Sequence, residues 1–193
     1  MLSAFIVIAI IVVALTLMGT RKHKARLAIN PRAIILNPVP LTTASIVMGI
    51  GVGGFIDGIV FHQILQWHEM LSNKIPATDY TGKSINMFWD GIFHAFCLFV
   101  VLTGVILLWK TSRRKDADVS GKLLSGGLIT GWGIFNIVEG IIDHQLLKLH
   151  NVMEYSNDHD IANYTFLATS VVMLVIGSFL IKSINRSNKN YSG

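Results

Sequence analysis

The chain has 193 residues, of which 52% are hydrophobic and only 14% are charged. A soluble domain usually has about a quarter of its residues charged, so this composition argues against an ordinary soluble protein. The formal net charge of +5 could suit a nucleic-acid partner, but the basic residues are distributed as in a membrane topology signal. Composition therefore predicts an integral membrane protein whose partner is the lipid bilayer and not nucleic acid.

Five apolar stretches follow one another along the chain, each long enough to cross a hydrocarbon layer of ~30 Å. The segments between them are rich in charge, Pro, Asn, Ser or Gly, as loops are. The predicted spans are residues 2–18, 42–70, 87–109, 123–150 and 161–181. Residues 1–20 are interpreted as a retained anchor helix and not a signal peptide, because the positive charges follow the apolar stretch. Residues 182–193 are predicted to form a tail.

The Lys and Arg residues predict the orientation of the spans. Thirteen of the 16 lie after the first span, after the third span or in the tail. Only Lys74, Lys83 and Lys148 lie on the other side. By the positive-inside rule, the N-terminus is expected outside and the C-terminus in the cytoplasm.

An internal repeat carries most of the polar residues. Residues 57–68 read DGIVFHQILQWH and residues 139–150 read EGIIDHQLLKLH, at an offset of 82 positions. One span separates the copies, so both helices run in the same direction, which is typical of a parallel repeat. The predicted fold is an all-α integral membrane protein of five transmembrane helices. Four of them form a bundle over residues 42–181, as two helical hairpins (42–109 and 123–181), and the N-terminal helix is added to it.

The returning helices match more weakly. Asp90 and His94 open the third span, and Asp160 and Tyr164 open the fifth. In both cases the two residues are four apart and share one helix face. This pairing predicts how the second helices of the two hairpins correspond.

Acids and imidazoles gather at one depth near the non-cytoplasmic face. An unpaired ionisable group inside the membrane costs at least ~2.5–3.5 kcal/mol, so these side chains are expected to face the bundle interior. Imidazole with carboxylate is the ligand set for Zn, Fe, Mn or Cu(II), and four-helix bundles hold metal ions in this way. The predicted ligands of one or two transition-metal ions are His62, His68, Asp90, His94, His144 and His150.

The first hypothesis for function is a redox or hydrolytic metalloenzyme with Glu139, Asp57 and Asp143 as candidate acid/base residues. A copper-handling or metal-delivery factor and a bis-histidine haem protein are the alternatives. Buried Asp–His and Glu–His pairs could also be interhelical hydrogen bonds or part of an ion path. On a straight helix, His62 lies about 140° around from Asp57. Two sites, a bend at Gly58 and Gly140, or ligands that only orient others would each account for this.

The segments GVGGFIDGIVFHQILQWHEM and GWGIFNIVEGIIDHQLLKLHNVM, with WDGIFHAF between them, resemble a bacterial membrane-protein family catalogued as domain of unknown function 2243. The resemblance spans residues 42–181 and implies a small helical protein of a bacterial plasma membrane. It also implies an association with respiratory-oxidase assembly and copper-handling proteins. Members often have a second histidine where this chain has Glu69 and Asn151, which makes a ligand at Asn151 doubtful.

Overall fold

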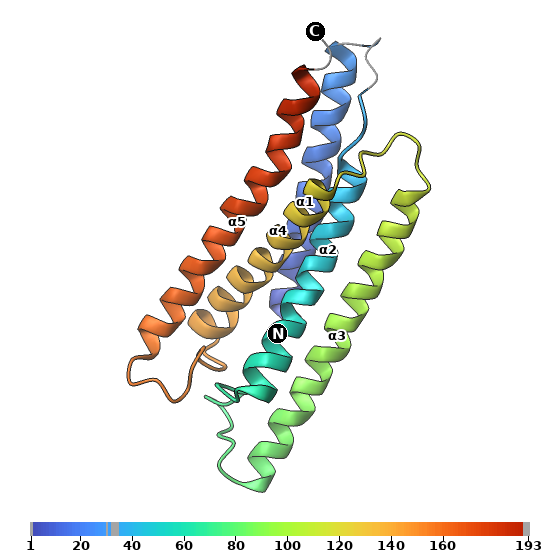
Figure 1. Cartoon of the computed structure of the whole chain (residues 1–193). Helices are drawn as coiled ribbons and strands as arrows, with labels where there is room; N and C mark the ends of the chain where they lie inside the picture. Colours follow the sequence, from blue (N-terminus) through green and yellow to red (C-terminus); the bar gives the residue numbers. More distant parts are fainter. Residues whose placement is uncertain (1, 30, 32–34, 191–193) are drawn as a thin grey trace.

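The computed structural model describes residues 2–29, 31 and 35–190, and shows five long helices (Figure 1). The second and fourth each continue into a wider, π-helical segment, η1 and η2. The elements are α1 (Leu2–Ile29), α2 (Val39–Ile56), η1 (Asp57–Ile64), α3 (Tyr80–Ser112), α4 (Gly121–Glu139), η2 (Gly140–Leu146) and α5 (His159–Asn190). All five helices are long and apolar enough to cross a membrane. The predicted fold class is confirmed.

The helices α2 and α4 form the centre of the bundle. In their most apolar windows 56% and 61% of the residues are buried, against 11% to 17% in α1, α3 and α5. The hairpin partners α3 and α5 pack on α2 and α4 respectively, and α1 lies across the central pair (Figure 1). Large apolar side chains such as Phe99 and Val175 point away from the protein. In a bilayer these outer faces meet lipid, so polar side chains are accommodated along the central pair.

Two glycines allow the central helices to touch backbone to backbone. A Cβ atom on Gly131 would overlap the carbonyl oxygen of Ile46, and one on Gly49 would overlap the carbonyl oxygen of Leu128. The two contacts are related by the repeat, because each partner also shifts by 82 positions. Small residues at such crossings are a common device of membrane helices. They hold the two halves in a fixed register.

The correspondence between α3 and α5 differs from the sequence prediction. Asp90 accepts a hydrogen bond from the backbone N–H of Met70, and Asn163 accepts the equivalent bond from Val152. Asp90 therefore corresponds to Asn163, at an offset of 73 positions, and not to Asp160. Asp160 is exposed. The prediction was wrong because it rested on only two positions of each helix, which also fit an alignment that is three positions out of register.

The ends of the central helices also differ from the prediction of unbroken helices to residues 70 and 150. Helical structure ends at Ile64 and Leu146. Gln66 and Lys148 then adopt left-handed backbone conformations, with φ of 51° and 49°. Such residues reverse the chain. The following segments therefore fold back over the end of the bundle instead of continuing into the headgroup region.

The two folded-back segments bind each other across the halves. The backbone N–H of Glu154 donates to the carbonyl of Trp67 at 2.8 Å, and that of Asn73 donates to the carbonyl of Leu149 at 2.9 Å. Trp67 and Leu149 are equivalent positions of the repeat. Each loop thus closes the end of the other hairpin.

The two terminal helices are longer than predicted. The first predicted span ended at residue 18, but α1 continues through the basic residues to Ile29, so these charges extend a helix and do not form a loop. At the other terminus α5 runs through Asn190, so most of the predicted tail is helical. The division of the chain into an anchor (1–20), a bundle (42–181) and a tail (182–193) as separate domains stays a prediction.

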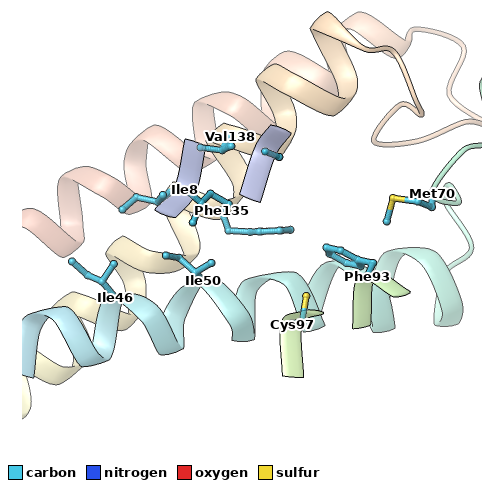
Figure 2. Packing of buried hydrophobic residues seen from close by; sticks show 10 residues of the cluster. Ile8, Ile46, Ile50, Met70, Phe93, Cys97, Phe135 and Val138 are labelled. Carbon is cyan, nitrogen blue, oxygen red and sulfur yellow. The ribbon is translucent and has the colours of Figure 1, made fainter. Parts of the chain in front are cut away.

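An apolar layer crosses the bundle next to the polar end. Figure 2 shows Phe135 and Val138 of α4, Phe93 and Cys97 of α3 and Ile50 of α2 packed into one cluster. This layer lies between the acidic residues and the basic end of the bundle. It separates the polar cluster from the opposite side of the membrane with tightly packed hydrocarbon.

Candidate metal centre

The π-helical segments bring an acid and a histidine together in each half. In a π-helix the backbone bonds join residues five apart, so side chains five apart lie on the same side. His62 Nε2 lies 3.1 Å from Asp57 Oδ2, and His144 Nε2 lies 3.1 Å from Glu139 Oε1. All four residues are buried. The wider helix therefore removes the angular mismatch expected for a straight α-helix.

His68 and His150 come from the folded-back segments and meet between the two acid–histidine pairs. Their rings are parallel, with an interplanar angle of 2° and centroids 4.6 Å apart. The ring centroid of His68 is 4.4 Å from that of His62, and the centroid of His150 is 4.7 Å from that of His144. Four imidazoles from the two halves therefore form one compact cluster about the pseudo-twofold axis.

The hydrogen bonding of His68 fixes its protonation. Its Nδ1 lies 2.8 Å from the backbone carbonyl oxygen of Val152. A carbonyl only accepts, so Nδ1 carries the hydrogen and Nε2 presents a lone pair. This arrangement, with the far N–H bound to a carbonyl, is the usual one for metal-binding histidines. Nε2 points into the cluster, 3.8 Å from Asp57 Oδ1.

Burial also keeps the two loop histidines neutral. Loss of hydration, with repulsion from His62, lowers the pKa of His68 to about 3. Loss of hydration, with repulsion from His68, holds the pKa of His150 well below its ordinary value. A neutral imidazole is the form that binds a metal. Both residues therefore need no deprotonation step near neutral pH.

The ligand atoms fall into two groups that share His68. Within each group, one nitrogen or oxygen atom per residue lies within 4.8 Å of all the others. The first group is His68, Glu139, His144 and His150, and the second is Asp57, His62 and His68. Two ligands held at about 2.1 Å by one ion are themselves about 3.0–3.4 Å apart. The acid–histidine distance of 3.1 Å in each half agrees with this separation.

Several atoms of this cluster lack a hydrogen-bond partner among the described residues. They are His68 Nε2, Glu139 Oε2, His144 Nδ1 and His150 Nδ1. A buried polar atom without a partner costs about 1–3 kcal/mol, and such atoms are rare in proteins. Because these atoms lie in one place, the cluster could hold a metal ion.

A small cavity adjoins the ligands. Its volume of about 10 Å³ is enough for about one water molecule. The carboxyl groups of Asp57, Glu139 and Asp143 border the cavity, and Met70 contributes a thioether. The N-terminal turns of α1 close it with Ala4, Phe5 and Ile8. The three candidate acid/base residues thus lie around one space that the first helix separates from lipid.

Two of the predicted ligands lie outside both groups. Asp90 Oδ1 is 2.9 Å from His62 Nδ1, the ring nitrogen on the side away from Asp57. His94 packs against Gly58 and stacks on Phe55, with ring centroids 6.0 Å apart. Asp90 is therefore placed to orient His62, and His94 is placed beside the site.

Three other residues with ligand-type side chains near this end of the bundle lie outside both groups. Glu69 is buried and accepts a hydrogen bond from Lys83. Exposed His159 lies 3.1 Å from the carbonyl of Glu154, and Met87 is also exposed. Neither the Val152 carbonyl nor Asn163 was recognised from the sequence. Aligning DGIFHAFC with NYTFLATS would have revealed Asn163, because Phe93 and Phe166 flank His62 and His144 alike.

The fold and this cluster define a helical membrane protein with buried His, Asp and Glu groups that could hold a metal. The chain belongs to the family described as a predicted membrane protein of domain type DUF2243, whose model matches residues 44–184. The match covers both hairpins and leaves out all of α1. No curated protein and no solved structure matches the chain.

Proposed function

We propose that this protein is a membrane metalloprotein that binds transition-metal ions between its two repeat halves. The observation that carries the proposal is the presence of two buried ligand groups that share His68. Each group contains the acid–histidine pair of one repeat half. The group of Glu139, His144, His150 and His68 offers four ligands and is the primary site. Asp57 and His62, with His68 within reach of both groups, form a secondary site for a second ion.

The ligand chemistry favours Zn, Fe, Mn or Cu(II) over Ca or Mg, because histidine nitrogens predominate. A haem is less well supported, since a porphyrin would have to enter between imidazoles whose centroids are only 4.6 Å apart. Redox or hydrolytic chemistry would take place at the adjoining cavity, where Asp143, which belongs to neither ligand group, would accept or donate protons. Asp57 and Glu139 would take that role only in a state in which they do not hold an ion. The apolar layer next to the cluster would block the passage of an ion across the membrane. It therefore favours a site that retains its ion and argues against a transport path.

Elemental analysis of the purified protein tests the proposal. We expect one to two equivalents of a transition metal per chain, removed by chelators and restored by titration. The ion should give an X-ray absorption spectrum with nitrogen and oxygen neighbours at about 2.0–2.2 Å. Protein that purifies without stoichiometric metal, and that takes up none of Zn, Fe, Mn or Cu when titrated, would overturn the proposal.

The variant Asp90→Asn tests the role of Asp90 as the residue that orients His62. We expect metal affinity to fall about 10–100-fold, as is typical when such a partner is lost. The unfolding temperature should change little, because an amide oxygen can still accept the Met70 N–H, as Asn163 does for Val152. Asp160→Asn is the matched control, on an exposed residue. Equal metal affinities in the two variants would contradict this role.

We further propose that the chain lies in a bacterial plasma membrane, with the metal centre at the non-cytoplasmic face. The support is the concentration of Lys and Arg at the opposite end. A green fluorescent protein fused after Gly193 should fluoresce, while alkaline phosphatase at the same place should be inactive. The reverse pattern would place the centre on the cytoplasmic side.

A further inference from the structure

A second, larger cavity lies at the other end of the bundle. Its volume is about 280 Å³, and it is bordered by α1, α2, α4 and α5. The part toward the membrane centre is apolar, with Val12, Leu15, Ile46 and Ile181 among its lining residues. The metal centre shares none of these residues. The cavity is therefore an independent feature of the fold.

Five described residues with a hydroxyl group line this cavity, and the four threonines among them have partners within the protein; the fifth is Ser178. Thr16 and Thr43 bind each other at 3.0 Å, Thr42 donates to the carbonyl of Pro38, and Thr130 donates to the carbonyl of Gly126. They leave little hydrogen-bonding capacity for a ligand. The inner wall thus behaves as an apolar surface.

The outer part of the same cavity is cationic. Lys22 and Arg26 of α1 and Lys182 of α5 line it, together with His23. The Nδ1 atom of His23 is buried and has no hydrogen-bond partner among the described residues. None of the described residues that line the cavity is acidic. The charges and the available imidazole nitrogen therefore suit an anionic group.

We propose that this cavity, the basic pocket, binds an anionic phospholipid, with the headgroup phosphate at Lys22, His23 and Lys182 and an acyl chain along the apolar wall. From Val12 to Arg26 the α1 side of the pocket extends about 21 Å at 1.5 Å per residue. A soluble anion would use only the outer end of this length. A lipid uses both ends, and basic pockets between transmembrane helices are suited to such headgroups.

The lipid would also fill the space between α1 and α5. The helix α1 packs on α2 and α4, and its far end closes the cavity of the metal centre through Ala4, Phe5 and Ile8. A lipid bound at the basic end would therefore help to hold α1 on the bundle along its whole length.

The test uses the purified full-length protein after delipidation, with binding followed by native mass spectrometry and by the shift in unfolding temperature. The probes are phosphatidylglycerol, phosphatidylcholine and inorganic phosphate. We expect phosphatidylglycerol to bind and to stabilise the protein, with phosphatidylcholine at least about 30-fold weaker, since each cation near a headgroup contributes about fivefold. Inorganic phosphate at the same concentration should neither shift the unfolding temperature nor displace the lipid.

Two double variants localise the effect. Lys22→Gln with Lys182→Gln should weaken phosphatidylglycerol binding about 30-fold. Lys24→Gln with Lys110→Gln removes the same charge from the same end of the bundle, outside the basic pocket, and should leave binding unchanged. All four lysines are exposed, so the variants should fold. Equal binding of the two lipids, equal loss in both double variants, or displacement of lipid by inorganic phosphate would each overturn the proposal.

Discussion

Replacing His68 with alanine is expected to lower metal affinity by more than about 100-fold, beyond the 10–100-fold typical for loss of a residue that only orients a ligand. His68 belongs to both ligand groups, so its loss leaves neither group complete. Its Nε2 lone pair is directed into the cluster by the Nδ1 bond to Val152. Metal titration of purified protein, followed by elemental analysis, measures the effect.

The matched control is His159→Ala. His159 is exposed and only contacts the carbonyl of Glu154, so this variant should retain the metal content of the unchanged protein. His68 is buried, so its replacement could also weaken the fold. Comparing the unfolding temperatures of the metal-free His68→Ala and His159→Ala proteins separates loss of a ligand from loss of the fold. A folded His68→Ala protein with undiminished metal would refute the shared-ligand arrangement.

The variant Gly131→Val is expected to have the largest effect on the fold. Its side chain would meet the backbone carbonyl of Ile46, which cannot move without separating α2 from α4. Overpacking of a core usually costs about 1–3 kcal/mol, and a clash with the α2 backbone at Ile46 and Ile50 should reach or exceed the upper value. Thermal unfolding in detergent should show a large decrease in midpoint or no folded protein at all.

Gly91→Val provides the comparison for this substitution. Gly91 lies on the exposed face of α3, and a Cβ there would meet no described atom within 4 Å. Stability should change by no more than about 0.5 kcal/mol, as for other surface positions. Because Glu139 lies on the same helix as Gly131, the Gly131→Val protein should also lose metal. Similar unfolding of the two variants would show that the close crossing of α2 and α4 is not required.

The sequence by itself determined the class of the protein, the five spans and the first helix of each repeat. Apolar length is a local property, and the cost of an ionisable group in hydrocarbon depends on depth, which can be counted along a helix. For this reason His62, His144, Asp57 and Glu139 could be assigned to one buried cluster. The repeat was readable because the two copies keep the same residues at the same spacing.

Only the tertiary structure decided how those residues meet. The π-helical widening that begins at Asp57 and at Gly140 is a rare backbone pattern that local sequence does not predict, so packing makes the choice. The chain reversals occur at Gln66 and Lys148, which carry no glycine signal for a left-handed conformation. Long-range hydrogen bonds also decided that Asn163 of α5 is the position equivalent to Asp90 of α3. Local preferences do not favour the observed conformations at these points, because left-handed non-glycine residues and π-helices are both uncommon. The packing of the two halves against each other supplies the free energy that selects them.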